Sequence, residues 1–445
     1  MIKAYNHQLQ TMSFGLEKGS YADLSEMGTG KSLSTLGIIN NYLKSNSNFT
    51  ALIIAPKSII TTAWISDCNW VFPRIKIIAA IGSKQDKIRL FKEPASIYVT
   101  NYETMNQGFD FFASGFDMLV CDESVKLKNP RAKWTKAITR LGQFVKYRII
   151  LSGLLTPNNL QEIYAPFNFI EKGIFGKSFW SFRSQYFTPD PFSFEMRQWI
   201  PKKFSEQKIT DKVSHLVIRH TKEKCLDLPE KIHTVRKTEM TASQKKIYLN
   251  MKKNAMIQLK DATVSALNKA SLIQKLAQIS SGFVYDSEKN THRFEGSGKL
   301  HELMSILEGE LAGEQVLIFT NFKAESKLFR AEFPDESFIY GGQNHKEQEE
   351  MIIKFKAGET QYMFASVSAA KYGLTFTNCS NVIYYSLNYS LDDFAQSQDR
   401  IHRIGQSKTC NYIYLLNKGT VDVQIYRALM KKKKLNELII DLIEG

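Results

Sequence analysis

The sequence lacks most of the features that mark secreted, zinc-binding or membrane proteins. Its five cysteines are scattered and form no Cys-x-x-Cys pair, which argues against a zinc site and against a disulfide framework. The first ten residues, MIKAYNHQLQ, show no secretory signal. No apolar run approaches the roughly 18 residues that a membrane-spanning helix requires. We therefore expect a cytoplasmic protein with no membrane partner.

Acidic residues are too few to balance the basic ones. Lysine and arginine together number 59 and aspartate and glutamate 44, so the formal net charge is +15 and a polyanionic partner is plausible. The sequence also has no internal repeat and no low-complexity segment, and its 43% hydrophobic and 23% charged residues are typical of a globular protein. A chain of 445 residues is too long for one hydrophobic core, so we expect two or three domains.

Short apolar segments alternate with helical patterns in two groups. The first group is ALIIAP, SIYVTNY, DMLVCDES and RIILSG, and the second is VLIFTNF, SFIYGG, YMFASV, NVIYYSL and NYIYLL. Such alternation favours parallel sheets, so we predict an α/β fold with two lobes, residues 1–230 and 231–445. The intervening residues, about 166–298, show helical periodicity and are predicted to form helical insertions, at about 166–215 and 240–297, and no sheet.

The segment SEMGTGKSLS, residues 25–34, has the pattern of a phosphate-binding loop. In such a loop the backbone amides surround phosphates, the lysine contacts the terminal phosphates and the hydroxyl binds Mg²⁺. Gly30, Lys31 and Ser32 match this pattern, but its first glycine is replaced by Ser25. A glycine-rich turn before an apolar helix would give the same residues, so a second element is needed to decide.

The segment LVCDES supplies that second element. An apolar strand that ends in two acidic residues places carboxylates at the carboxyl end of a sheet, where open α/β folds bind ligands. Asp122 can hold Mg²⁺ directly or through water, and Glu123 can orient and deprotonate the attacking water. A solvated strand end is the alternative, but together with the phosphate loop the pair favours phosphoryl transfer.

The segment QSQDRIHRIGQ carries two arginines near the end of the chain. Arginine stabilises charge that spreads onto a γ-phosphate, because its guanidinium group is planar and permanently charged. Arg400 and Arg403 are three positions apart, so we expect both on one face of a helix. We interpret them as catalytic arginine fingers donated by the second lobe.

Together these segments resemble the motifs of helicase superfamily two, most closely the SWI/SNF-like DNA translocases and their phage branch-migration relatives. HQLQTMSF resembles the adenine-reading glutamine motif, LIIAPKSIITTAW the first DNA-contacting motif, and LSGLLTPNN the coupling motif. VIRHTKEKCLDLPEK is similar to the family's link between lobes, and FASVSAAKYGLTFTNCSNVIYY to a motif of the second lobe. The most specific matches are QSQDRIHRIGQ and the Lys-Asn pair of CDESVKLKN. The resemblance implies two RecA-like lobes that use ATP and Mg²⁺.

The resemblance also implies roles for individual residues. Gln8 is expected to read adenine. The expected nucleotide contacts are Gln8, Met27, Gly28, Thr29, Gly30, Lys31, Ser32 and Gly373. Backbone amides and hydroxyls are expected to hold successive phosphates of one DNA strand at Pro56, Lys57, Thr100 and Asn101 in the first lobe and at Thr320, Asn321 and Ser366 in the second. Because the phosphate loop and the arginines fall in different lobes, we expect a shared ATP site.

Three departures from the family pattern concern coupling. Ser124 and Val125 replace the usual Ala-His after the acidic pair, so a histidine commonly used in coupling is missing. Leu154 and Leu155 stand where the coupling motif usually has Thr-Pro. The fifth motif keeps only Gly373 of its several glycines. These changes bear on step direction and coupling strength rather than on nucleotide binding.

We expect an ATP-dependent DNA helicase or translocase that acts as a monomer on duplex, forked or four-way DNA. Fork remodelling, branch migration or unwinding in phage or bacterial replication, recombination or repair would suit such an enzyme. The alternatives are an RNA-directed helicase and a nucleotide-gated DNA-binding module without turnover. Glu123 and both arginines argue against the module, because a passive clamp needs no catalytic acid.

The aromatic segment FWSFRSQYF has two interpretations. Trp180 or Phe182 can stack on DNA bases. Aromatic residues at this density more often pack in a helical core, and we favour that interpretation.

Overall fold

The computed structural model describes residues 4–108, 115–191, 199–260, 266–286, 288, 290–367 and 375–444. The chain forms two compact units. Unit 1 contains residues 1–227 and 432–445, and unit 2 contains residues 228–431. Among the described residues, no helix is long and apolar enough to cross a membrane.

Unit 1 is built on a seven-stranded sheet in the order β3-β4-β2-β5-β6-β1-β9, and every strand pair in it is parallel. Its strands are β1 (Tyr21–Asp23), β2 (Ala51–Ala55), β3 (Ile77–Ala79), β4 (Ile97–Asn101), β5 (Met118–Asp122), β6 (Tyr147–Leu151) and β9 (Val217–Ile218), and a separate hairpin pairs β7 (Phe187–Pro189) with β8 (Trp199–Pro201). Its helices are α1 (Asn6–Lys18), α2 (Lys31–Ser45), α3 (Lys57–Ile59), α4 (Ser66–Val71), α5 (Lys84–Lys92), α6 (Lys133–Leu141), α7 (Tyr164–Ile170), α8 (Phe179–Tyr186), α9 (Ser205–Val213) and α10 (Lys222–Cys225).

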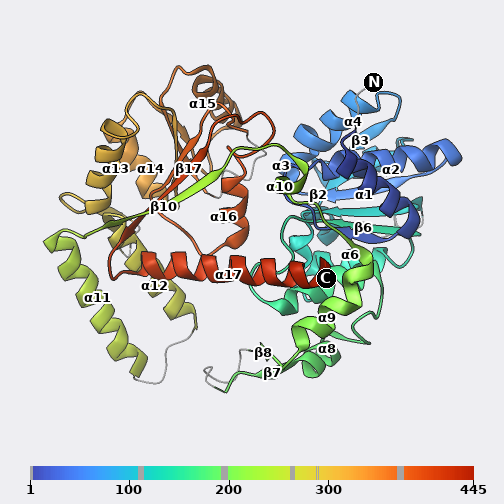
Figure 1. Ribbon diagram of the computed structural model, residues 1–445, viewed down its shortest axis with the longest axis horizontal. Coiled ribbons are helices and arrows are strands. Elements are labelled where there is room, and N and C mark those ends of the chain that lie inside the picture. The colour runs from blue at the N-terminus through green and yellow to red at the C-terminus, as the bar shows by residue number, and fades with distance from the viewer. Residues whose placement is uncertain are drawn as a thin grey trace. The chain divides into compact units, whose positions relative to one another are not determined.

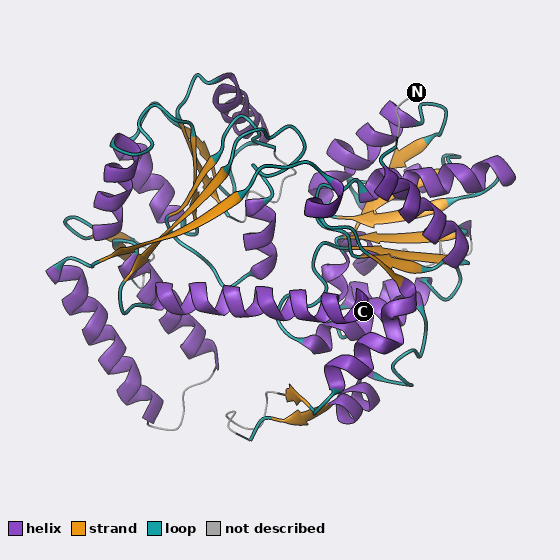
Figure 2. Ribbon diagram, viewed as in Figure 1, coloured by secondary structure: helices purple, strands orange, loops and turns teal. Residues whose placement is uncertain are grey.

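Helices cover both faces of this sheet, as Figure 2 shows. Along β2, Leu52 and Ile54 belong to one apolar core and Ile53 to another. Leu36 of α2 packs in the Ile53 core, and Ile138 of α6 packs in the other. Because successive side chains of a strand point to opposite faces, a strand covered on both sides must be apolar throughout, which explains the uninterrupted segment ALIIA.

Unit 2 is built on a six-stranded, all-parallel sheet in the order β10-β17-β16-β13-β15-β14. Its paired strands β10 and β17 are labelled in Figure 1. Its strands are β10 (Lys231–Thr238), β13 (Val316–Thr320), β14 (Ser337–Ile339), β15 (Tyr362–Ser366), β16 (Asn381–Tyr384) and β17 (Cys410–Asn417), and a hairpin pairs β11 (Phe283–Tyr285) with β12 (Thr291–Arg293). Its helices are α11 (Ala242–Lys260), α12 (Ala266–Ser280), α13 (Gly298–Glu308), α14 (Lys323–Glu332), α15 (His345–Ala357) and α16 (Leu391–Gln398), and α17 (Val421–Glu444) begins here and ends in unit 1.

The predicted α/β class with two parallel-sheet lobes is confirmed, and each of the apolar segments chosen from the sequence overlaps a strand of one of the two sheets. The expectation that residues 166–298 contain no sheet is wrong. Strand β9 joins the sheet of unit 1, and the eight-residue β10 joins that of unit 2. The sequence KIHTVRKT lacks the uninterrupted apolar pattern of a central strand, because β10 is an edge strand in which only Thr238 is buried. Residues 432–445 belong to unit 1, whereas the sequence placed them in the second lobe.

Candidate nucleotide site and nucleic-acid edge

The predicted phosphate loop connects β1 to α2, and the helix begins at Lys31. Gly28 and Gly30 have φ angles of 85° and 88°, which lie in the left-handed region that favours glycine. Gly30 is constrained a second time, because a methyl group on it would lie 2.1 Å from Nε2 of Gln8. The glycines therefore give the turn that brings backbone N–H groups together at the N-terminus of a helix, which suits an anion.

Lys31 and Ser32 open α2, as the phosphate-loop pattern predicts. The Lys31 Nζ donates hydrogen bonds to the carbonyl oxygens of Ser25, at 2.6 Å, and Glu26, at 3.0 Å. These acceptors belong to the loop itself, so the ammonium group stays over the concave side of the turn. The Ser32 hydroxyl makes no hydrogen bond to any other residue that the structure describes, so both of its lone pairs are available to a ligand.

The loop is fixed from outside by the segment that follows β9. The Ser25 hydroxyl accepts a hydrogen bond from the His220 N–H at 3.0 Å, and Glu26 Oε2 accepts one from the Lys222 N–H at 3.0 Å. On the other side, the His7 ring contacts the Thr29 carbonyl oxygen at 2.7 Å. Predicted nucleotide contacts such as Thr29 thus belong to a loop whose shape is determined by three separate chain segments.

The acidic residues lie at the same edge of the sheet as this loop. Asp122 of β5 and Asp23 of β1 are both paired with Leu151 of the intervening strand β6. The carboxyl ends of these parallel strands therefore place the two carboxylates beside the loop that follows β1. Asp23 was not chosen from the sequence. Its Oδ1 accepts from the Ser25 N–H at 3.0 Å, while its buried Oδ2 has no hydrogen-bond partner among the described residues.

Asp122 is buried and held by specific donors. Its Oδ2 accepts the indole N–H of Trp64 at 2.9 Å, and its Oδ1 accepts the Glu123 N–H at 2.8 Å. Burial raises the pKa of Asp122, and the Trp64 hydrogen bond and the nearby charge of Lys31 oppose that rise. Both opposing groups favour a charged carboxylate at this position.

Glu123 adopts a strained backbone conformation, with φ 50° and ψ 53°. Left-handed geometry in a residue other than glycine or asparagine costs about 1–2 kcal/mol and tends to occur at functional sites. The strain turns the chain sharply after β5, and the half-buried Glu123 follows the buried Asp122 directly. The two adjacent carboxylates therefore have different environments, as the different predicted roles require.

The donor set fits a Mg²⁺ ion. Mg²⁺ prefers oxygen ligands and usually keeps several waters beside one or two protein ligands and phosphate oxygens. The Ser32 hydroxyl and the Asp122 carboxylate are such ligands, and each oxygen of Asp122 keeps a lone pair beyond its one hydrogen bond. The unpartnered Oδ2 of Asp23 adds negative charge to this edge of the sheet.

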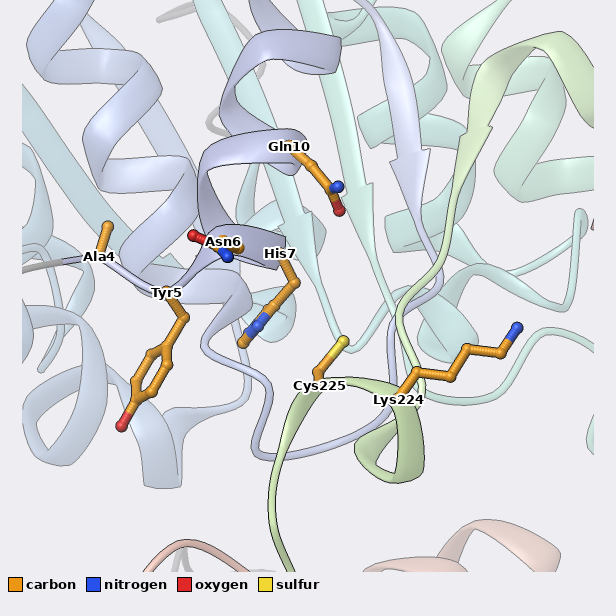
Figure 3. A pocket seen from close by; sticks show the side chains of 7 residues that line it. All are labelled: Ala4, Tyr5, Asn6, His7, Gln10, Lys224 and Cys225. Carbon is orange, nitrogen blue, oxygen red and sulfur yellow. The ribbon is translucent and has the colours of Figure 1, made fainter.

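An open pocket of about 640 Å³ lies beside the phosphate loop. It is lined by Ala4, Tyr5, Asn6, His7, Gln10, Lys224 and Cys225. Figure 3 shows the residues of the N-terminal segment opposite those of α10. Tyr5 stacks on His7 with ring centroids 5.6 Å apart, which gives the pocket an aromatic wall. Gln8 is buried behind this wall, where its Oε1 accepts the Tyr5 N–H at 3.0 Å.

The coupling segment contacts the phosphate loop. A methyl group on Gly153 would lie 3.0 Å from the Met27 side chain, so the two segments touch at this point. The unusual residue Leu155 and the following Thr156 both donate backbone N–H bonds to Oδ1 of Asn436, at 3.0 and 3.1 Å. Asn436 is a buried residue of α17, and no sequence pattern connected it with this segment.

The predicted DNA contacts lie at strand ends in both units. Ala55, which precedes Pro56 and Lys57, pairs with Asn101 across β2 and β4. In unit 2, Thr320 pairs with Ser366 across β13 and β15. The sheets thus bring together each predicted group within its own unit.

Two of these residues are placed differently from the expectation that their hydroxyls face DNA. Thr100 is buried, and its hydroxyl donates to the Ala80 carbonyl oxygen at 2.7 Å. Thr320 is buried as well, and its hydroxyl lies 3.5 Å from the Ala365 carbonyl oxygen. The neighbouring Asn101 and Asn321 are half-buried and remain accessible at the same strand ends.

The two arginines are not on one helical face, so that prediction is wrong. Helix α16 ends at Gln398, and Arg400 and Arg403 lie in the turns that follow. Arg400 is buried and its carbonyl oxygen accepts the Phe376 N–H, whereas the half-buried Arg403 donates to the Thr375 hydroxyl at 2.8 Å. The helix ends at its C-cap residue Asp399, and the Gly405 φ of 100° marks a further turn after Arg403. Gly373, a predicted nucleotide contact, lies outside the described residues.

Sequence reasoning missed Trp64 as part of this site. The residue closes the segment LIIAPKSIITTAW, which was assigned to DNA contact, and it lies in the π-helical segment Ile60–Ile65 with no exposed surface. A buried indole N–H normally requires a hydrogen-bond partner, so a tryptophan in this apolar segment could have been expected to bond a polar group. The partner itself, Asp122, could not be identified without the fold.

Two family models and several known proteins match this chain. The family model SNF2-related domain matches residues 22–281, and the helicase conserved C-terminal domain matches residues 298–405. An uncharacterized ATP-dependent helicase of Mycoplasma genitalium is 28% identical over 439 residues, which cover 96% of this chain and 40% of that protein. Protein p41 of the Acyrthosiphon pisum secondary endosymbiont phage 1 is 24% identical over 439 residues, which cover 94% of each. The solved SWI2/SNF2 ATPase core domain of Sulfolobus solfataricus aligns with 99% of this chain and 91% of its own at 26% identity, with a TM-score of 0.47.

The match to the helicase conserved C-terminal domain, together with the two parallel-sheet units, places this chain in the helicase class. Because the matching model covers more than half of the chain, this chain belongs to the SNF2-related family. The chain spans 40% of the length of the mycoplasma relative, but 94% of the length of the phage protein.

Proposed function

We propose that this chain is a DNA-dependent ATPase that moves along DNA. The observation that carries the proposal is the shared edge of the unit 1 sheet. There, a glycine-turned loop at a helix N-terminus lies beside a buried, hydrogen-bonded carboxylate, within a chain of the SNF2-related family. A phosphate cradle and a charged carboxylate next to it are the parts that phosphoryl transfer to water needs.

Individual residues have the following proposed roles. The amides of residues 28–32 and the Lys31 ammonium group bind the β- and γ-phosphates, and the pocket with its Tyr5–His7 wall receives the base and sugar. Ser32 and Asp122 hold Mg²⁺, which neutralises phosphate charge when it is bound. Glu123 orients the attacking water and removes its proton. Gln8 contributes to adenine recognition, and Arg400, Arg403 and Gly373 keep their predicted roles at the γ-phosphate and the nucleotide as part of this proposal.

The nucleic-acid partner is proposed to be DNA. A net charge of +15 favours a polyanion, and membership of the SNF2-related family favours DNA over RNA. Pro56, Lys57 and Asn101 in unit 1, and Asn321 and Ser366 in unit 2, are the proposed phosphate contacts, with the backbone amides next to Thr100 and Thr320. Phosphate contacts carry little sequence information, so we expect binding that depends on DNA form rather than base sequence.

The finer proposal is that a monomer remodels forks or migrates branches in phage or bacterial DNA metabolism. The similarity to a phage protein along nearly its whole length supports this setting. The test is to measure the rate of ATP hydrolysis without nucleic acid and with duplex DNA, forked DNA, a four-way junction or RNA of equal length. Stimulation by duplex or branched DNA that exceeds stimulation by RNA is the expected result. Stimulation by RNA alone would contradict the DNA assignment, and DNA binding without hydrolysis would support a passive module.

A further inference from the structure

A surface of unit 1 outside the motifs above combines an exposed indole with two guanidinium groups. Trp180 of α8 is 58% exposed. The Arg183 guanidinium lies 5.3 Å from the centre of the Trp180 ring and 4.1 Å from that of Trp199, on the hairpin strand β8. The Arg131 guanidinium, from the loop before α6, lies 5.9 Å from the centre of the Trp180 ring. We call these four residues the Trp180 surface.

The positive charge of this surface is not neutralised within the part of the chain that the structure describes. Neither Arg131 nor Arg183 pairs there with a carboxylate, and the buried Nε of Arg183 has no hydrogen-bond partner there. Burial and the charge of Arg131 lower the pKa of Arg183, so the two cations are close enough to repel each other. Two neighbouring cations repel each other, and an anion bound between or beside them relieves that repulsion.

The neighbouring chain extends the positive region. Between Ser124 and Arg140 the sequence has basic residues but no acidic one. Lys126 and Lys133 in this segment are exposed, as is Arg131. A strand of nucleic acid lying on the Trp180 surface would therefore meet further cations along its backbone.

Trp180 is exposed although other aromatic side chains of the same helix are well packed. Phe182, two positions away, is fully buried and packs against Phe175 and Tyr186. The helix thus completes its apolar core without Trp180. Indole faces stack on nucleic-acid bases, but only unpaired bases expose their faces, because a duplex buries them.

We propose that the Trp180 surface binds a single-stranded segment of DNA, with an unpaired base on Trp180 and the flanking phosphates on Arg131 and Arg183. The surface is separate from the nucleotide site, and its binding requires no ATP turnover. It gives the protein a means to recognise DNA that has an unpaired strand, such as a fork or a gap. Single-strand binding at this surface is a property beyond the proposed ATPase activity, and it can be tested separately from that activity.

The experiment measures the fluorescence anisotropy of a labelled oligothymidine and of a labelled duplex of equal length, each titrated with the full chain without nucleotide. Trp180→Ala should weaken oligothymidine binding about 5- to 100-fold, the usual worth of one base–aromatic stack. Duplex binding should change less than about twofold, because stacking requires an unpaired base. Trp180→Phe, which keeps an aromatic face, should restore most of the single-strand affinity.

Matched controls separate stacking from general effects. Trp70 is also exposed in unit 1, at 63%, and Trp70→Ala should leave both affinities unchanged. Arg131→Ala and Arg183→Ala should each lower the salt dependence of single-strand binding by about 0.7 in the log–log slope, the value for one phosphate contact, whereas the exposed Arg74→Ala should not. Equal oligothymidine affinities of Trp180→Ala and Trp70→Ala would overturn the proposal. An equal loss on single strand and duplex would overturn the assignment to single strands.

Discussion

Unit 2 contains a buried ion pair whose disruption gives a direct test of the packing described above. Lys299 of α13 is 1% exposed and Asp422 at the start of α17 is 7% exposed, with 2.7 Å between Nζ and Oδ2. Lys299 also donates to the Tyr385 carbonyl oxygen at 3.1 Å, and Asp422 accepts from the Ser280 hydroxyl at 2.6 Å. The pair therefore joins two helices and the end of a third to the sheet.

The perturbation is Lys299→Met, which keeps most of the volume but removes the charge. Asp422 would remain buried with only neutral donors, and a buried charge that loses its partner costs about 3–5 kcal/mol. The Ser280 hydroxyl and the N-terminus of α17 still stabilise the carboxylate, so we expect the lower end, about 3 kcal/mol. Adding Asp422→Asn removes the uncompensated charge and should restore more than half of the loss.

Hydrogen–deuterium exchange of backbone amides measures this loss in the unit where it occurs. A loss of about 3 kcal/mol speeds exchange of the most protected amides about 10²-fold, so peptides from β13 and β16 should show this change. Peptides from β2 and β5 in unit 1 serve as an internal control. Lys418→Met is the matched variant, because the Lys418–Glu239 pair is exposed and exposed ion pairs contribute little to stability. If Lys299→Met accelerates amide exchange in β13 and β16 less than about threefold, the buried pair stabilises unit 2 no more than an exposed pair does. That result would refute the argument that the buried charge depends on its partner.

Two further predictions concern the nucleotide site. Trp64→Phe removes the indole donor to Asp122. Because a hydrogen bond to a charged group is worth about 1.5–3 kcal/mol, the ATPase rate should fall about 10- to 100-fold, while Trp70→Phe should have no effect. An unchanged ATPase rate in Trp64→Phe would show that Trp64 does not contribute to the site. Glu123→Gln keeps the side-chain shape but loses the base, so turnover should fall at least about a hundredfold while Mg²⁺-dependent ATP binding persists, and rapid hydrolysis by this variant would exclude Glu123 as the water-activating residue.

Much of the fold could be predicted because buried parallel strands have a strong sequence signature. Segments such as VLIF of β13 and MFA of β15 are apolar throughout and buried, as is typical of strands in a parallel sheet. The edge strand β10 could not be predicted in the same way, because it mixes polar and apolar side chains and only one of them, Thr238, is buried. The short strands β1 and β9 have too few residues to show any periodicity.

The site could be predicted in part. The order of glycines, Lys31 and Ser32 reflects local backbone geometry, and local geometry can be read from neighbouring residues. The contributions of Trp64 and Asn436 depend on contacts with Asp122 and Leu155, which are distant in sequence and become neighbours only through sheet order and helix packing. Arg400 and Arg403 were placed on a helix because their spacing permits it, but the chain turns at Asp399 and Gly405 instead.

The most direct test of the central claim compares Lys31→Ala with Lys44→Ala. Both lysines belong to α2, but Lys31 begins the helix in the phosphate loop, whereas Lys44 is exposed in its last turn. The measurement is the steady-state rate of ATP hydrolysis with saturating duplex DNA and Mg²⁺. We predict that Lys31→Ala loses at least about 99% of the rate, because removing a charged phosphate contact from a preorganised site costs about 3 kcal/mol or more. Lys44→Ala should keep the full rate. A DNA-stimulated rate near that of the unaltered protein in Lys31→Ala would contradict the assignment of this loop as the ATP site.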